Sequence, residues 1–187
     1  AIKQGKLKPE EAKALQTNWS AVSKSLSATS ELRLVVARPI QDVFSRVEKE
    51  TGLTILVDWP ALLEEGWDLN TELTWEGKAK PVEKTLAATL RSMKLGMLIV
   101  DGNTVQITSR KNVNRSLWIE VYSYHEILKK IPLRVFKQRI SRALGDKIGP
   151  RMVANFDDSS NSLITILPQP LHRRFEKVLD NMVQEKN

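Results

Sequence analysis

The chain has 187 residues, 41% of them hydrophobic and 27% charged, which is enough for one ordinary domain or two small ones with buried cores. It contains no cysteine, which excludes disulfides, thiol nucleophiles and cysteine-ligated zinc, and no apolar run approaches the roughly 18 residues that cross a bilayer. The net charge of +7 arises in the C-terminal part, because residues 1–110 hold 15 basic and 14 acidic side chains whereas residues 111–187 hold 14 and 8.

The first predicted element is a helix from residue 8 to about residue 28. Apolar residues recur along it at spacings of three and four, namely Ala12, Leu15, Trp19, Val22 and Leu26. A serine-rich stretch, residues 23–30, closes the segment, and the first twenty residues do not match a secretory signal. We therefore expect residues 1–30 to form an N-terminal helix and a linker.

Residues 32–108 predict the order β-α-β-β-α-β-β. Proline stands at the start of each helix, at Pro39 and Pro81, and a glycine follows each helix, at Gly52 and Gly96. Strands are predicted at 32–37, 54–57 and 71–76, and a hairpin at 97–108. Each helix has one apolar stripe, so we expect one sheet with the helices on one of its faces.

Residues 109–114 are polar and without periodicity, which predicts a linker. The order predicted beyond it is β-α-β-β-α, again one sheet with helices on one face. In its first strand Leu117, Ile119 and Val121 alternate with Trp118, Glu120 and Tyr122. The fold class expected for the whole chain is therefore α+β, with two small domains after an N-terminal helix.

Certain residues in this order resemble a known family. The helix at 39–47 followed by Thr51–Asp58 (TGLTILVD), together with 81–90 and 95–108, resembles the small N-terminal domain of secretins and of TonB-dependent receptors. The stretch Phe156–Ile164 (FDDSSNSLI), followed by the helix at 171–182, resembles the KH-like N-domain that comes next in secretins. The resemblance places these two domains at residues 31–110 and 115–187, and the segment 59–70 lengthens the first of them.

The resemblance implies a non-enzymatic protein-interaction or assembly module of a bacterial envelope protein, located in the periplasm or otherwise outside the cytoplasm. It implies no cofactor and no ligand residues. We also expect the chain to be a fragment or a relative of larger envelope proteins.

Three polar motifs have simple structural interpretations. Asp157 and Asp158 beside two serines and an asparagine favour a turn over a calcium loop, whose ligands stand at alternate positions. The acidic residues Asp58, Glu64, Glu65 and Asp68 predict a solvated face. The stretch 145–149 is one residue longer than the GXXG loop of nucleic-acid-binding KH domains, so its first glycine is interpreted as a helix stop.

Two sets of residues are candidates for a partner surface. Trp59 and Trp67 lie in the lengthened segment, and the basic helix at 132–144 and its surroundings supply Lys130, Arg134, Lys137 and Arg142. The leading hypothesis is a protein partner or self-assembly, through an exposed sheet edge and this basic helix. The alternative is a KH-like nucleic-acid-binding protein that uses the basic C-terminal domain.

No group of residues in the sequence suggests the active site of an enzyme. His125 and His172, the two histidines, are interpreted as surface or packing residues. No metal or cofactor is expected.

Overall fold

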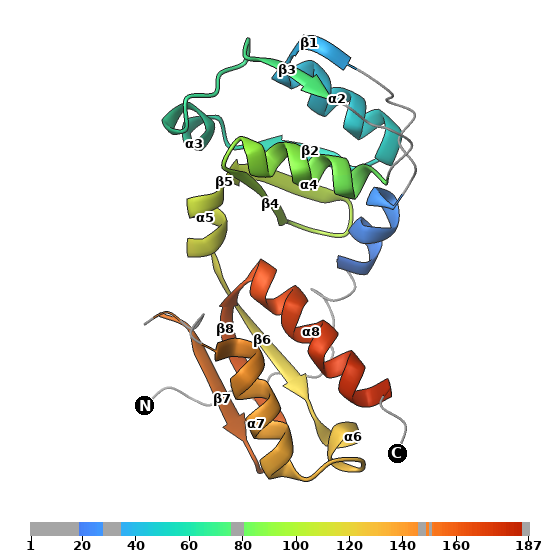
Figure 1. Ribbon diagram of the computed structural model, residues 1–187, viewed down its shortest axis with the longest axis vertical. Helices are drawn as coiled ribbons and strands as arrows, with labels where there is room; N and C mark the ends of the chain where they lie inside the picture. The colour runs from blue at the N-terminus through green and yellow to red at the C-terminus, as the bar shows by residue number, and fades with distance from the viewer. Residues whose placement is uncertain (1–18, 28–34, 76–80, 146–148, 150, 185–187) are drawn as a thin grey trace. The chain divides into compact units, whose positions relative to one another are not determined.

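The computed structural model describes residues 19–27, 35–75, 81–145, 149 and 151–184 (Figure 1). It divides the chain into two compact units, Ala1–Val113 and Asn114–Asn187. Both units combine helices with small sheets, so the predicted α+β class is confirmed. None of the helices in the described ranges has the length and apolar character of a membrane span.

The first unit follows the predicted order of elements, with two short helices added. Its elements are β1 (Val35–Pro39), α2 (Ile40–Thr51), β2 (Thr54–Val57), α3 (Trp59–Glu64), β3 (Glu72–Trp75), α4 (Val82–Ser92), β4 (Leu95–Ile99), β5 (Thr104–Ser109) and α5 (Arg110–Arg115). The helix α5 occupies the segment predicted as a linker. That prediction was wrong because a six-residue helix is too short to show a periodic apolar stripe.

The strands of the first unit form two sheets rather than the single sheet expected. β1 pairs with β3 in one antiparallel ribbon, while β5 pairs with β2 in parallel and with β4 in an antiparallel hairpin. The helix α2 contacts β1 and β3 on one side and β2 on the other, and Figure 1 shows it between the two sheets. Periodicity in the sequence marks a strand but not its partner, because partners such as β2 and β5 lie some fifty residues apart.

The predicted helix boundaries are confirmed at three of four ends. Pro39 and Pro81 directly precede α2 and α4, and Gly52 ends α2 in a left-handed conformation with its N–H donating to Glu48. At the end of α4, however, Lys94 takes the left-handed conformation (φ 59°), and Gly96 lies within β4.

The core of the first unit includes a helical segment near the N-terminus. Residues 19–26 are helical, and Trp19, Val22 and Leu26 are buried with the apolar residues of α2 and α4. The predicted stripe is thus confirmed for these three residues, whereas Ala12 and Leu15 lie outside the described residues.

The second unit has β6 (Leu117–Ser123), α6 (His125–Leu128), α7 (Leu133–Leu144), β7 (Val153–Asp157), β8 (Ser162–Pro168) and α8 (Gln169–Gln184). Its sheet is antiparallel with the order β6-β8-β7. α7 and α8 lie on the same face of this sheet, as expected (Figure 1). Its core is formed by aromatic and aliphatic residues of α7, α8 and β8, among them Phe136, Ile140, Leu163, Leu167 and Phe175.

Candidate functional site

The two tryptophans of the lengthened segment pack against the first unit. Trp59 is the first residue of α3, Trp67 follows that helix, and both side chains are half-buried against the core. The indole Nε1 of Trp67 donates to the carbonyl of Met93 at 2.9 Å, which ties the segment to the end of α4. Each ring therefore offers only part of its surface to a partner, and a partner role for the pair stays a prediction.

The acidic residues around the same segment have mixed roles. Asp58 caps α3, because its Oδ1 accepts from the N–H of Ala61 at 3.3 Å and its Oδ2 accepts from the Thr108 hydroxyl at 2.7 Å. Glu64 and Asp68 are exposed, as a solvated face requires. The four acids therefore do not converge on one site, since Asp58 is held inside the fold.

Two of the four basic candidates in the second unit are held by other groups of that unit. Lys130 donates to the backbone carbonyl of Val183 near the end of α8. Lys137 lies 2.9 Å from a carboxylate oxygen of Asp158 and 5.0 Å from the centre of the Phe156 ring. Both amines therefore have local partners that an external ligand would have to displace.

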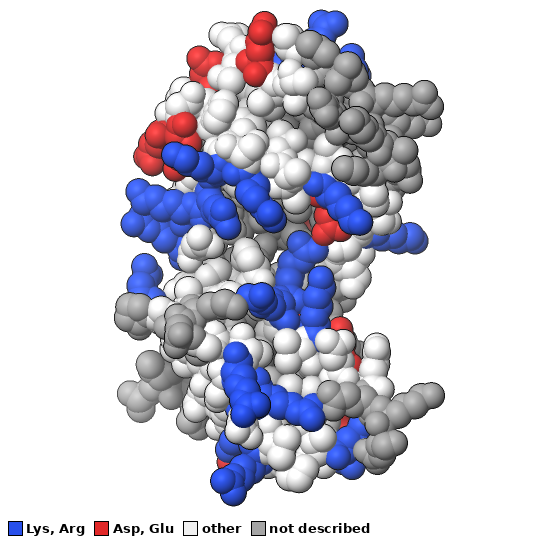
Figure 2. All heavy atoms as spheres, in the orientation of Figure 1, with Lys and Arg blue, Asp and Glu red and all other residues white. Residues whose placement is uncertain are grey.

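The other two basic candidates, Arg134 and Arg142, are exposed on α7. Neither forms an ion pair with another residue of the described part of the second unit. Lys and Arg side chains lie over α7 on the face that Figure 2 shows. An exposed surface of this kind attracts anions weakly and in a salt-dependent way.

The acidic turn between β7 and β8 is a hydrogen-bonded turn, as predicted. The Asp157 carboxylate accepts from the N–H and the hydroxyl of Ser159 and from the hydroxyl of Ser160, at 3.0, 2.5 and 2.7 Å. These bonds lower the pKa of Asp157. The Asp157 carboxylate oxygens thus accept hydrogen bonds from within the turn itself.

Asp158 connects this turn to the core of the second unit. Its carboxylate accepts from the hydroxyl of Tyr124 at 3.0 Å as well as from Lys137, and the bond with Lys137 is the main reason that its pKa is lowered. Burial, with a smaller contribution from Asp158, raises the pKa of Tyr124 to about 12. Tyr124 is therefore a neutral hydrogen-bond donor at physiological pH.

One face of the second sheet carries apolar side chains that the described helices of the second unit, α6, α7 and α8, leave uncovered. Ile119 and Val121 of β6 stand opposite Ile166 and Ile164 of β8, and Val153 of β7 stands opposite Ile166 on the other side. Ile119 is 63% exposed and Val153 is 42% exposed, while the other three are partly exposed. We call these five residues the open sheet face.

The opposite set of β6 residues, Trp118, Glu120 and Tyr122, faces the helices. Glu120 is only 8% exposed, although glutamate in an alternating strand ordinarily marks the side that faces water. Sequence reasoning therefore missed the open sheet face. The alternation was visible, but it did not show which of the two sets lies under α8.

Two carboxyl groups of the second unit, the buried Glu120 and the half-buried Glu176, interact electrostatically. Desolvation raises the pKa of Glu120 to about 7. It raises that of Glu176 on α8 to about 7 as well, where Glu120 adds electrostatic repulsion. These two carboxyls between β6 and α8, the buried carboxyl pair, share the helix-facing side of the sheet with Tyr122, whose pKa burial also raises.

His172 lies in the same region as a packing residue. Its Nε2 donates to the carbonyl of Trp118 at 2.9 Å, because a carbonyl only accepts, which leaves Nδ1 to accept from the Tyr122 hydroxyl at 2.9 Å. Burial lowers the pKa of His172, so the ring is neutral at physiological pH. His125 is exposed, and both histidines thus match their interpretation as packing and surface residues.

Comparison with known proteins returns solved structures alone, since no protein-family model and no curated protein matches the chain. A dimeric cysteine mutant of the N-terminal domain of the secretin XcpQ from Pseudomonas aeruginosa is 16% identical over 82% of this chain and 65% of that one, with a TM-score of 0.33. The secretin PilQ of the V. cholerae type IV competence pilus is 14% identical over 81% and 38%, with a TM-score of 0.33.

A third similar structure is the GspC–GspD complex from the type II secretion system of enterotoxigenic Escherichia coli. It is 12% identical over 81% of this chain and 98% of that chain, with a TM-score of 0.31. XcpQ and PilQ are secretins, the class of protein whose N-terminal domains the sequence resembles. The chain spans less than two thirds of the length of these two secretin chains, 65% for XcpQ and 38% for PilQ.

Proposed function

We propose that the chain is a non-enzymatic assembly module of a bacterial envelope protein, located outside the cytoplasm, and that it associates through the open sheet face. The observation that carries the proposal is the exposure of Ile119 and Val153 beside three further β-branched residues on one continuous surface. Contiguous exposed apolar surface costs solvation free energy and marks interaction sites in soluble proteins.

The partner we propose for this face is a second copy of the chain. The interior positions of the face carry no charged side chain, whereas the whole chain has a net charge of +7. Two copies therefore repel one another least when they meet through this surface. Two such sheets can pack face to face at about 10 Å, as in a β-sandwich, and bury both apolar faces at once.

Sedimentation velocity of the full chain tests this proposal. The weight-average sedimentation coefficient should rise with concentration up to about 1 mM, where a free energy of only about 4 kcal/mol populates a dimer. Ile119→Lys should abolish the rise, because it places two lysines in one apolar interface without removing any core contact. Ile119→Thr keeps the β-branched shape and should weaken association to a smaller extent.

The matched control is Val183→Lys, which adds the same charge at a 41% exposed valine on α8. It should leave association unchanged. A wild-type chain that stays monomeric over the whole range would contradict self-association through this face. An equal loss in the Ile119→Lys and Val183→Lys variants would show that net charge, rather than the face, controls association.

A further inference from the structure

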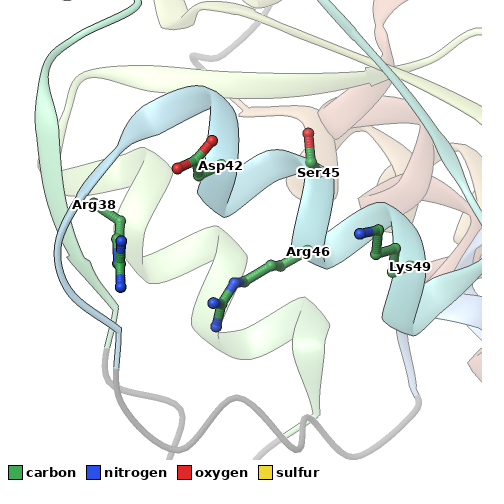
Figure 3. Close-up of a pocket in the computed structure, with 5 residues that line it drawn as sticks. All are labelled: Arg38, Asp42, Ser45, Arg46 and Lys49. Atoms are coloured by element: carbon green, nitrogen blue, oxygen red, sulfur yellow. The ribbon is translucent and has the colours of Figure 1, made fainter.

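A concavity on the first unit is lined by five polar side chains. Arg38 comes from the end of β1, and Asp42, Ser45, Arg46 and Lys49 come from α2 (Figure 3). The four α2 residues stand three or four apart and so share the outer face of that helix, opposite its buried stripe. The space they enclose has a volume of about 230 Å³ and opens to solvent. We call it the α2 concavity.

The α2 concavity has an excess of positive charge. Three of its side chains are cations and one is an anion, which gives the lining a net charge of +2. The ion pairs formed among the described residues, Lys129–Glu126 and Lys137–Asp158, both lie in the second unit. The cations of the concavity therefore lack carboxylate partners in the described part of the first unit, and Figure 3 shows the head group of Arg46 extending towards that of Arg38.

The backbone before Arg38 holds this residue in place. The pairing of β1 with β3 shifts its register between Val35 and Arg38, and Ala37 within this bulge has a φ of 46°. A left-handed conformation is unfavourable for alanine, and bulges redirect the side chains that follow them. The next residue is Pro39, whose ring fixes φ. Arg38 thus stands between two constrained residues, as positioned binding residues often do.

We propose that the α2 concavity binds a phosphate monoester dianion. The net charge of +2 on the lining matches the charge of such a group near neutral pH. The guanidinium groups of Arg38 and Arg46 can each donate two hydrogen bonds to phosphate oxygens, with Lys49 and the Ser45 hydroxyl as further donors. Asp42 accepts hydrogen bonds only, so it can accept from a ligand hydroxyl where the ligand has one, as glycerol 1-phosphate does, but it is not required for the phosphate itself.

A phosphate monoester reaches such a site either as a soluble compound or as a lipid headgroup, and two probes distinguish these sources. Isothermal titration calorimetry with glycerol 1-phosphate tests whether the chain binds a soluble phosphate monoester. Cosedimentation with phosphatidylcholine vesicles, with and without phosphatidic acid, tests the headgroup. Saturable binding in either assay is expected. It should weaken with added salt, because the site is open to solvent.

Two variants and one control decide the assignment. Arg38→Gln and Arg46→Gln should each raise the dissociation constant about tenfold or more, the usual effect of removing a charged hydrogen-bond donor. Arg91→Gln removes an exposed arginine from α4 of the same unit and should leave binding unchanged. Circular dichroism verifies that each variant is folded.

The proposal is overturned if neither probe binds saturably. It is also overturned if Arg91→Gln weakens binding as much as Arg46→Gln does, because the chain would then bind anions through its overall charge. Binding of glycerol 1-phosphate alone assigns a soluble ligand, and binding of phosphatidic acid vesicles alone assigns a headgroup. Either result supports the proposed site if the Arg38→Gln and Arg46→Gln variants lose that binding.

Discussion

The buried carboxyl pair makes the stability of the second unit depend on pH, and Glu120→Gln isolates the effect. The pKa of Glu120 is about 7 in the folded chain against an ordinary value of 4.5. A difference of this size corresponds to about 3 kcal/mol, at roughly 1.4 kcal/mol for each pH unit. Glutamine keeps the shape of the side chain and removes its ionisation.

The sign follows from proton binding. A carboxyl whose pKa is raised on folding holds its proton in the folded state and loses it in the unfolded state, so stability falls as pH rises from about 4.5 to about 7. Above pH 7 the wild type carries the full penalty of a buried charge. Glu120→Gln should therefore be more stable than the wild type by about 2–3 kcal/mol at pH 8. The two chains should be nearly equal at pH 4.5.

Urea unfolding at a series of pH values measures this difference. Hydrogen–deuterium exchange in peptides from β6 and β8 assigns the transition to the second unit. His172 also makes stability depend on pH in this range. Because its pKa is lowered in the folded chain, its contribution makes the chain less stable as pH falls. The comparison of variant with wild type at each pH removes that contribution, because both chains contain His172.

Glu126→Gln is the matched control, because Glu126 is an exposed glutamate whose pKa is lowered by its bond with Lys129. It should bring no gain in stability at pH 8. The reasoning is refuted if Glu120→Gln shifts stability equally at pH 4.5 and pH 8. It is also refuted if the variant is less stable than the wild type at pH 8.

Three further predictions concern packing, anchoring and the basic surface. Gly96→Ala should lower the free energy of unfolding in urea by about 1–3 kcal/mol, because an added Cβ would lie 2.8 Å from Cγ2 of Val113. Adding Val113→Ala to the same chain should recover part of this loss. Trp67→Phe should cost about 1 kcal/mol by removing the indole hydrogen bond to the carbonyl of Met93, and an unchanged stability would show that this bond does not anchor the segment. Fluorescence anisotropy with single- and double-stranded oligonucleotides should show at most weak binding that about 150 mM salt abolishes. Binding that persists at that salt concentration and is lost in Arg134→Gln would favour the nucleic-acid alternative instead.

The two arginine-containing surfaces have different structural settings. Arg134 and Arg142 project from a regular helix, where nothing in the backbone restricts their side chains. Arg38 stands between a bulge and a proline, beside two further cations of α2. The second unit is therefore the more basic one, but the backbone does not restrict its arginine side chains. The nearly neutral first unit contains the α2 concavity. Net charge alone does not locate a binding site, because the arrangement of the charges matters as well.

Local features of the sequence predicted most of the secondary structure correctly. Pro39, Pro81 and Gly52 act through their own backbone restrictions, so they mark helix boundaries in any tertiary setting. The Asp157 turn was likewise predictable, because its side chain bonds to residues two and three positions away. The helix α5 was not predictable, since six residues with a single apolar side chain, Val113, carry no periodic signal.

Properties that depend on distant parts of the chain were set by the tertiary structure alone. The division of the first unit into two sheets depends on pairings such as β2 with β5. The alternation in β6 was evident, but whether Ile119 or Glu120 is buried depends on which side of the strand α8 packs against. The left-handed conformation of Ala37 lies where the register of β1 against β3 shifts, directly before Arg38. The sequence by itself therefore determined most of the helices and strands and the boundaries at Pro39, Gly52 and Pro81, because those signals act over a few residues. The open sheet face and the buried carboxyl pair exist only where folding brings separate segments together, whereas the α2 concavity is lined by residues 38–49 of one continuous segment.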